Sequence, residues 1–261
     1  YNNIIDTPRP SHADYSAFVK HNGFNDVSGG GHFSGRLTAP LCFAGAVCMQ
    51  LLEDMGVEIL AHIQKIKNVY DDEIDFVNIG KWNTAEKEFP VINDEKGKLM
   101  IAEIEKAREN GDSVGGVIQC AVTGVKAGFG DPMFDGVENK LSKNIFGIPA
   151  VKGIEFGNGF SATDLYGSEN NDEFCTINGD IKTKTNNAGG INGGITNGMP
   201  IIFRTAIKPT PSIFKEQNSV SLQNKTEEKL QIKGRHDPCI VQRAVPVVEA
   251  VTAITILDII L

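Results

Sequence analysis

The sequence Gly-Arg-His-Asp-Pro-Cys at positions 234–239 places a guanidinium, an imidazole and a carboxylate side by side at Arg235, His236 and Asp237. Pro238 favours an extended conformation in the residue before it, which predicts that the triplet lies on a turn or at a strand end and not inside a helix. In extended backbone Arg235 and Asp237 point to the same side, so a base would lie next to a cation. The alternative is an exposed charged turn, which is the favoured interpretation of this triplet taken alone.

A second imidazole, His12, lies in the sequence Arg-Pro-Ser-His-Ala-Asp-Tyr at 9–15, between the cation of Arg9 and the carboxylate of Asp14. An imidazole exchanges its proton near neutral pH, because its ordinary pKa is about 6.5. His12 could therefore act as a general acid. An isolated histidine is more often structural than catalytic, so both interpretations stay open on the residues alone.

Three glycines at 29–31 precede a run of side chains that leads into a predicted helix. Such a turn can present backbone N–H groups to an anion, but three glycines alone are weak evidence for a site. The side chains that follow them are those of His32, Phe33, Ser34 and Arg36.

The sequence Lys-Pro-Thr-Pro-Ser at 208–212 follows a predicted strand. Its cation and two hydroxyl groups lie on a turn that two prolines stiffen, so little ordering entropy is lost when they bind a phosphate or the polar edge of a flavin. An ordinary strand exit has the same composition. The residues alone support these two interpretations about equally.

Together with Asn-Asn-Ala-Gly-Gly at 186–190, Asn-Gly-Met-Pro at 197–200 and Arg-Ala-Val-Pro at 243–246, these segments follow an order that resembles the chorismate synthase family. The resemblance runs from about Arg9 to the C-terminal helix. It implies an α+β fold in which a helical layer is sandwiched between antiparallel β-sheets, and it implies a homotetramer. Residues 1–261 would then be a single domain of this family from which the N-terminal segment is missing.

The resemblance also implies an activity, the lyase reaction that removes phosphate and a ring proton from 5-enolpyruvylshikimate 3-phosphate to give chorismate. The cofactor would be reduced flavin mononucleotide (FMN), with no net redox change, and NADPH would enter only to reduce the flavin. His12 would protonate the flavin, Asp237 would be the base, and Arg36 would bind the substrate. The residues expected to contact FMN are His32, Phe33, Ser34, Pro149, Ala150, Gly193, Lys208, Pro209, Thr210, Pro211, Ser212 and Arg235.

Two departures from the family pattern bear on activity. His32 and Phe33 stand where the family has arginine and serine, which changes the expected flavin contacts there. The family's opening Gly-Glu-Ser-His-Gly motif, with its second catalytic histidine and the arginines after it, is absent from the sequence. We therefore expect this chain by itself to fold but to turn over little substrate. The alternative hypothesis is a catalytically inactive flavin-binding or structural fragment.

Composition places the chain among globular proteins and narrows its partners. Of its 261 residues 41% are hydrophobic and 22% are charged, so a sizeable core is expected and disorder is disfavoured. The net charge of −8 argues against nucleic acid as a partner, whereas a few focused cations can still bind a small anionic metabolite. The five cysteines show no C-x-x-C spacing, which speaks against disulfides or a metal site and favours a cytoplasmic setting.

Periodicity predicts alternating helices and antiparallel strands. The longest apolar run, 244–261, is interrupted by Glu249 and Asp258, so it is predicted to be a buried core helix and not a membrane span. A third predicted helix has Phe134 on its apolar stripe. Predicted helices cover 38–53, 94–110, 131–145 and 244–261, and predicted strands cover 57–63, 114–125, 151–156 and 200–208.

Three polar regions receive specific predictions. In the strand over 57–63, His62 falls on the polar side of the alternation. The acidic run at 71–73 is predicted to be a solvated turn. The Gly- and Asn-rich stretch 157–198 is either functional or disordered, with disorder expected over 170–184.

Overall fold

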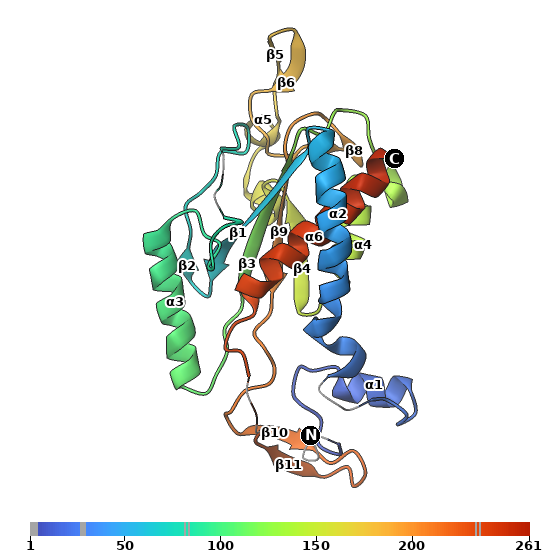
Figure 1. Cartoon of the computed structure of the whole chain (residues 1–261), viewed down its shortest axis with the longest axis vertical. Coiled ribbons are helices and arrows are strands. Elements are labelled where there is room, and N and C mark those ends of the chain that lie inside the picture. The colour runs from blue at the N-terminus through green and yellow to red at the C-terminus, as the bar shows by residue number, and fades with distance from the viewer. Residues whose placement is uncertain (1–4, 27–29, 81, 83, 233, 235) are drawn as a thin grey trace.

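A five-stranded antiparallel sheet forms the centre of the chain (Figure 1). The computed structural model describes residues 5–26, 30–80, 82, 84–232, 234 and 236–261. The sheet has the order β2-β1-β3-β9-β4, and its helices and antiparallel strands confirm the predicted α+β class. Its strands are β1 (Glu58–Ile66), β2 (Val69–Tyr70), β3 (Gly116–Thr123), β4 (Val151–Phe156) and β9 (Ile201–Ile207).

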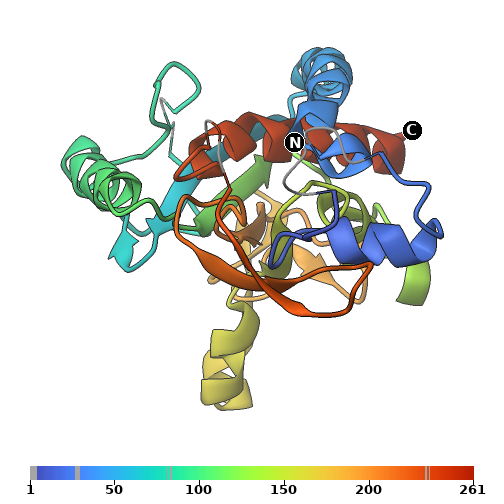
Figure 2. The ribbon, with the colours of Figure 1, turned by 90° about the horizontal axis from the view of Figure 1, so that it is seen from below.

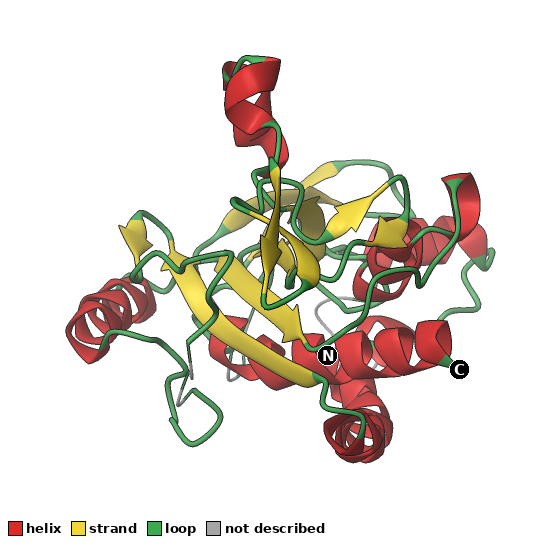
Figure 3. Cartoon of the chain, turned by 90° about the horizontal axis from the view of Figure 1, so that it is seen from above, coloured by secondary structure: helices red, strands yellow, loops and turns green. Residues whose placement is uncertain are grey.

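Two long helices lie on one side of this sheet. Helix α6 (Val241–Ile260) packs directly on β1 and β3, and α2 (Ala39–Asp54) crosses α6 on its outer side, as Figures 2 and 3 show from opposite directions. The crossing is very close, because a Cβ placed on Gly45 would lie 2.3 Å from Cβ of Ala250. Only glycine at position 45 allows the two backbones to approach this far. The helical layer therefore has a fixed contact point.

The buried side of the sheet is apolar and closely packed. Ile118, Ile201 and Phe203 have no exposed surface, and they belong to one core cluster with the inward residues of α6. Burial of such side chains stabilises the fold by about 1.5–3 kcal/mol each. The interruptions in the apolar run of α6 do not prevent its burial, so the prediction of a core helix there is confirmed.

Helix α2 differs from α6 because its outer side is bare. Between Ala39 and Leu52 it carries no charged residue, yet Phe43 is 78% exposed and Val47 and Leu51 are about half exposed. By length and composition alone the helical stretch 35–54 could cross a membrane, and 11% of its most apolar window is buried. Helix α6 covers only the side of α2 on which Gly45 lies.

The remaining elements surround the sheet ends. A hairpin of β5 and β6 protrudes at the top of Figure 1, while α1, β10 and β11 lie at the opposite end. The helices are α1 (Asp14–Lys20), α3 (Asp94–Glu109), α4 (Val137–Ile145) and α5 (Gly167–Asn170), and the short 3₁₀ turns are Gly31–Phe33, Gly35–Thr38, Met133–Asp135 and Gly159–Asp164. The further strands are β5 (Phe174–Ile177), β6 (Asp180–Thr183), β7 (Ile191–Asn192), β8 (Ile195–Thr196), β10 (Gln217–Val220) and β11 (Glu227–Leu230).

Two local predictions are wrong. Phe134 is 83% exposed, because extended backbone at Gly136 delays the start of α4 until Val137. The segment 170–184 contains the paired strands β5 and β6 where disorder was expected. Their turn uses positive φ at Asn178 and Gly179, a hairpin signal that the surrounding polar composition masks.

The predictions for His62 and the acidic run are also wrong in part, since a buried polar network lies there. His62 and Asp71 are buried, with His62 Nδ1 2.8 Å from Asp71 Oδ2 and His62 Nε2 3.0 Å from Gln119 Oε1. Asp71 also accepts the backbone N–H groups of Ile92 and Asn93 at 2.6 and 3.0 Å. The network fastens the segment after β2 to the sheet. Period-2 alternation misassigned His62 because the segment that follows β2 covers its face of β1.

Candidate functional site

Segments that are far apart in the sequence meet at the end of the molecule where α1, β10 and β11 lie (Figure 1). The Arg9 guanidinium donates through Nη1 to Ser212 Oγ at 3.4 Å, and the Lys208 ammonium donates to the carbonyl oxygen of Ser11. These two contacts join the N-terminal segment to the turn after β9. The structure therefore brings the motif at 9–15 and the motif at 208–212 into one site.

A compact ionic cluster surrounds His12. Arg9 donates from Nε and Nη2 to the two carboxylate oxygens of Asp14, each at 2.7 Å, and His12 Nδ1 lies 2.6 Å from Asp14 Oδ1. The side chains of His12 and Asp14 are 15% and 18% exposed. A bidentate guanidinium–carboxylate pair fixes orientation as well as charge. The imidazole is thereby held in one orientation.

The electrostatics of this cluster leave one ring nitrogen for chemistry. Burial alone would raise the pKa of Asp14, but hydrogen bonds from Arg9 and His12 outweigh it and hold the pKa well below its usual range. The carboxylate stays ionised and accepts the Nδ1 side of the ring. His12 Nε2 is then the atom that can exchange a proton with a ligand.

The turn at Gly30 and Gly31 lies against His12 Nε2. A Cβ placed on Gly30 would lie 3.8 Å from His12 Nε2, and the φ of 107° at Gly30 favours glycine there. The next residues form two 3₁₀ turns, in which Ser34 Oγ accepts the backbone N–H of Arg36 at 3.2 Å. The side chains of Phe33 and Arg36 are exposed, as is most of this turn.

The turn after β9 combines a cation with hydroxyl groups. The backbone N–H of Lys208 donates to the carbonyl oxygen of Ala150 at 3.0 Å. Burial, and then the neighbouring charge of Lys152, lower the pKa of Lys208. The carbonyl of Thr210 accepts the Ser113 hydroxyl at 2.7 Å, whereas Thr210 Oγ1 is buried without a hydrogen-bond partner among the described residues. A buried hydroxyl of this kind has hydrogen-bonding capacity left for a ligand.

The segment 236–238 also reaches this site. The positive charge of Arg9 lowers the pKa of His236, after the larger effect of burial. Ser212, His236 and Asp237 line the same small cavity. Asp237 Oδ2 accepts from Arg243 Nη1 at 2.8 Å. Arg235 lies outside the described residues, so its predicted flavin contact has no structural account here.

Gly193 is the one predicted site residue, of those the structure describes, that lies far from this site. It turns between β7 and β8, with a φ of 62°, at the end of the sheet opposite α1 in Figure 1. Pro149, Pro209 and Pro211 are the chain neighbours of Ala150, Lys208 and Ser212. His32 lies in the 3₁₀ turn that follows Gly30.

Sequence reasoning gave no role to several residues that build the site. Arg9 and Asp14 stood in the same motif as His12, and the mixed charge three to five residues apart was the signal for their pairing. Ser113 carried no such signal, because its partner is a carbonyl oxygen 97 positions away. Contacts of this kind depend on how the strands are arranged.

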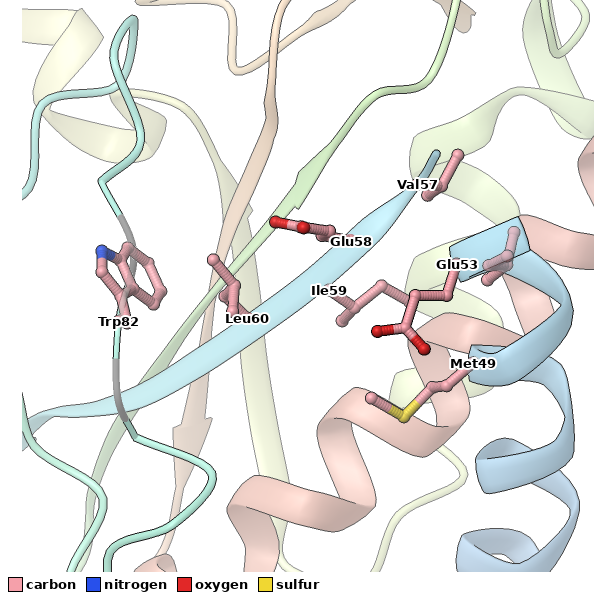
Figure 4. A pocket seen from close by; sticks show the side chains of 8 residues that line it. Met49, Glu53, Val57, Glu58, Ile59, Leu60 and Trp82 are labelled. Atoms are coloured by element: carbon pink, nitrogen blue, oxygen red, sulfur yellow. The ribbon is translucent and has the colours of Figure 1, made fainter. Parts of the chain in front are cut away.

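A separate groove lies away from this site. It has a volume of about 310 Å³ and is bounded by the end of α2, the outer edge of β1 and Trp82 (Figure 4). Its walls are mainly apolar, with Glu53 and Glu58 at the rim. None of the predicted site residues lines it. Over the described residues no group of three or more His, Cys, Asp or Glu side chains is arranged to hold a metal ion.

Comparisons with known proteins agree with the resemblance to the chorismate synthase family. The family model described as chorismate synthase matches residues 1–261. A chorismate synthase of Korarchaeum cryptofilum is 47% identical over 261 residues, which cover 99% of this chain and 71% of that protein, and one of Thermococcus gammatolerans is 45% identical with the same coverage. A solved chorismate synthase structure superposes with a TM-score of 0.78 at 28% identity, over 95% of this chain and 69% of that one. This chain belongs to the chorismate synthase family.

Proposed function

We propose that this chain carries the chemistry of chorismate synthase, the elimination of phosphate and a ring proton from 5-enolpyruvylshikimate 3-phosphate, with reduced FMN as the cofactor. The observation that carries the proposal is the meeting of three motifs at one end of the molecule: the His12–Asp14–Arg9 cluster, the turn at 208–212 and Asp237. Family membership supports the reaction class, a carbon–oxygen lyase that uses reduced flavin.

The donors at the site fit a flavin phosphate and a polar ring edge. Lys208 supplies a cation whose pKa is lowered by burial, and Thr210 supplies a buried hydroxyl without a partner among the described residues. Ser212 adds a second hydroxyl beside Arg9. We assign these three residues, with the backbone of 149–150 and 32–34, to FMN. Reduced flavin, when bound, would supply an electron to the substrate as phosphate leaves and would recover it as the ring proton is lost, with no net redox change.

Different residues of the chain then transfer protons and bind the charged groups of the substrate. His12 holds the proton at Nε2, on the side of the glycine turn, while Asp14 and Arg9 keep the ring oriented. Asp237 accepts the ring proton of the substrate, and Arg243 fixes its carboxylate. Arg36, exposed beside the turn, binds an anionic group of the substrate.

Four finer properties belong to the same proposal. The protein acts as a homotetramer, in the cytoplasm, on a small-molecule substrate, without a nucleic-acid or membrane partner. The net charge of −8 supports the exclusion of nucleic acid. The uncharged outer side of α2 supports association, because an exposed apolar face of this kind is typical of an interface.

Anaerobic titration with reduced FMN tests the cofactor assignment. The absorbance of the flavin is followed with and without saturating substrate, using the chain alone and the chain fused to a relative's N-terminal segment. We expect a spectral change and tighter binding with substrate in the fused protein. If neither form shows any change, the FMN assignment is wrong.

Replacement of Asp237 by Asn tests the reaction. The amide keeps the size of the carboxylate and loses the base, so turnover by the fused protein should fall about 10²–10⁴-fold while flavin binding persists. Asp180→Asn, on the distant β6 strand, is the matched control. Near-normal turnover in Asp237→Asn would support the alternative interpretation, in which the 235–237 triplet is an exposed charged turn without a catalytic role. Equal rates for the chain alone and the fused protein would show that the chain needs no added segment, whereas binding without turnover in both would favour an inactive flavin-binding fragment.

A further inference from the structure

The strand β4 begins with a strained turn. The Ile148 carbonyl accepts the backbone N–H of Val151 at 3.3 Å, which closes a turn with Pro149 and Ala150 at its centre. Ala150 has a φ of 75°, a left-handed conformation in which glycine is usual. Residues other than glycine that are held in this conformation are strained, and they cluster at functional sites. The turn therefore points to a function at the start of β4.

A β-bulge follows this turn directly. Val151 of β4 lies opposite Ile207 of β9. The next pair is Gly153 with Ala206, so Lys152 is an extra residue on the β4 side. A bulge bends its strand and changes the direction of the side chains there, and bulges are common next to active sites. Because β4 is the last strand of the sheet, the bulge also lies at an edge, where Lys152 is exposed.

The bulge brings Lys152 to the end of β9, where Lys208 lies. The backbone N–H of Lys208 donates to the Ala150 carbonyl at 3.0 Å, so these two residues face each other across the strands. Lys152 follows Ala150 by two positions, and such a diagonal separation of about 7–8 Å is within reach of long side chains. The two charges act on each other, because Lys152 lowers the pKa of Lys208, after the larger effect of burial.

No carboxylate of the described residues neutralises these two cations. Eight lysines in that part of the chain pair with a carboxylate, and neither Lys152 nor Lys208 is one of them. The Lys208 ammonium donates to the Ser11 carbonyl, which leaves two of its three N–H groups for a ligand. The buried Thr210 hydroxyl, two positions further on, also has no partner there. Like charges repel each other, and a bound dianion offsets that repulsion.

We propose that Lys152 and Lys208 together bind a phosphomonoester dianion at the end of β9, with the bulge of β4 supplying Lys152 as the second cation. Two ammonium groups match the charge of such a phosphate, which is close to −2 near neutral pH. Thr210 donates a further hydrogen bond. The identity of the ligand rests on the proposed function, which offers the phosphate of FMN and that of the substrate, whereas the binding of phosphate does not.

Titration of the chain as it stands with inorganic phosphate tests the site. The lysine side chains are labelled with carbon-13 and followed by NMR. We expect the Lys152 and Lys208 signals to shift together until the site is saturated. Lys152→Met should weaken phosphate binding about tenfold, the lower end for a hydrogen bond to a charged group, whereas Lys152→Arg keeps the charge and should bind phosphate as the parent chain does.

Lys126→Met is the matched control for Lys152→Met. Lys126 is also exposed and forms no ion pair with the described residues, and its carbonyl accepts the Thr196 hydroxyl of β8, at the other end of the sheet. Phosphate binding by this variant should equal that of the parent chain. The absence of a saturable shift in the parent chain, or equal binding by Lys152→Met and Lys126→Met, would overturn the proposal.

A second measurement needs no ligand. Because the charge of Lys152 lowers the pKa of Lys208, Lys152→Met should raise the pKa of Lys208 toward its ordinary value. Lys126→Met should leave the pKa of Lys208 unchanged. Both values are read from the carbon-13 shifts against pH. An unchanged pKa of Lys208 in Lys152→Met would show that the two cations do not share a site.

The fused protein distinguishes the two phosphates. If the site binds the phosphate of the cofactor, Lys152→Met should weaken the binding of reduced FMN about tenfold and leave that of reduced riboflavin, which lacks the phosphate, unchanged. If it binds the phosphate of the substrate, flavin binding should persist and KM should rise about tenfold at similar kcat. A fused protein that turns over substrate and shows neither change would refute the assignment. If the chain binds phosphate as expected but the fused protein binds no flavin and has no turnover, the proposed function is at fault and not the phosphate site.

Discussion

Two histidine–aspartate pairs in this chain have almost the same geometry and opposite surroundings. His12 Nδ1 lies 2.6 Å from Asp14, and His62 Nδ1 lies 2.8 Å from Asp71. The first pair keeps 15% and 18% of its side-chain surface exposed, whereas the second pair keeps none. The distance between imidazole and carboxylate therefore does not distinguish a site from a core.

The difference lies in the second ring nitrogen. His62 Nε2 is 3.0 Å from Gln119 Oε1, so both of its nitrogens have partners inside the protein. His12 Nε2 faces Gly30, a residue without a side chain, and no hydrogen-bond partner for Nε2 is present among the described residues. A guanidinium holds Asp14, while backbone N–H groups hold Asp71. We propose that the pair of His12 and Asp14 serves the reaction, whereas the pair of His62 and Asp71 fastens the segment after β2 to the sheet.

Loss of the His12 ring should give the largest effect on function. In the fused protein, His12→Ala should lower turnover about 10²–10⁴-fold, most severely at alkaline pH where other acids substitute poorly. The free energy of unfolding should change little, because the ring is not in the main core. Steady-state kinetics across pH, next to His21→Ala as a control, measure this. A rate that is unchanged at every pH would remove the difference between the two pairs.

Loss of Asp71 should affect stability and not chemistry. Asp71→Ala leaves His62 and two backbone N–H groups buried without their acceptor, so the free energy of unfolding should fall by about 3–5 kcal/mol. Urea denaturation measures it, and the neighbouring Asp72→Ala, whose side chain is 47% exposed, is the matched control. A reduced turnover per folded molecule without a loss of stability would show that the buried pair takes part in the reaction.

Glu249 offers a smaller effect and a third case, a largely enclosed carboxylate that forms no ion pair with the described part of the chain. Burial raises the pKa of Glu249 to about 7, although it accepts the backbone N–H of Ala61 at 2.9 Å. Because the folded pKa lies above the unfolded one, its contribution to stability is present at low pH and is lost as the pH rises through about 7. Glu249→Gln should therefore stabilise the chain by about 1–3 kcal/mol at pH 8 and by little at pH 4. Thermal unfolding at both values checks this, and an equal shift at both would refute a titration effect.

The regular elements could be predicted from the sequence because their periodicity is strong. The core helix α6, the strand β3 and the helix α3 all lie close to their predicted ranges. His62 could not be predicted, since the alternation of a strand identifies an outward face only where that face meets water. The burial of Asp71 could not be predicted for the same reason: the groups that donate to its carboxylate come from β1 and from the segment that ends at Asn93.

Some features of the candidate site could likewise be predicted from the sequence, and others could not. The order of its motifs is legible in the sequence, and the structure places most of those it describes at one end of the sheet. The contact of Arg9 with Ser212, 203 positions away, depends on β9 ending beside the N-terminal segment. The packing of His236 on Phe214 depends likewise on where α3 ends. Such pairings are properties of the assembled sheet and carry no local sequence signal.

The close crossing at Gly45 and Ala250 gives the two halves of the site a common pivot. Helix α2 begins just after the turn that faces His12, and α6 begins just after the loop of Asp237. At 1.5 Å per residue, Gly45 lies about 9 Å from the start of α2 and Ala250 about 14 Å from the start of α6. Since the backbones touch, the helices can rotate about this point but cannot slide past it, and a rotation of about 5° shifts either end by about 1 Å. A shift of that size can change a rate by about a hundredfold, so we expect one glycine far from the proposed reacting atoms to affect how His12, the proposed acid, is aligned with Asp237, the proposed base.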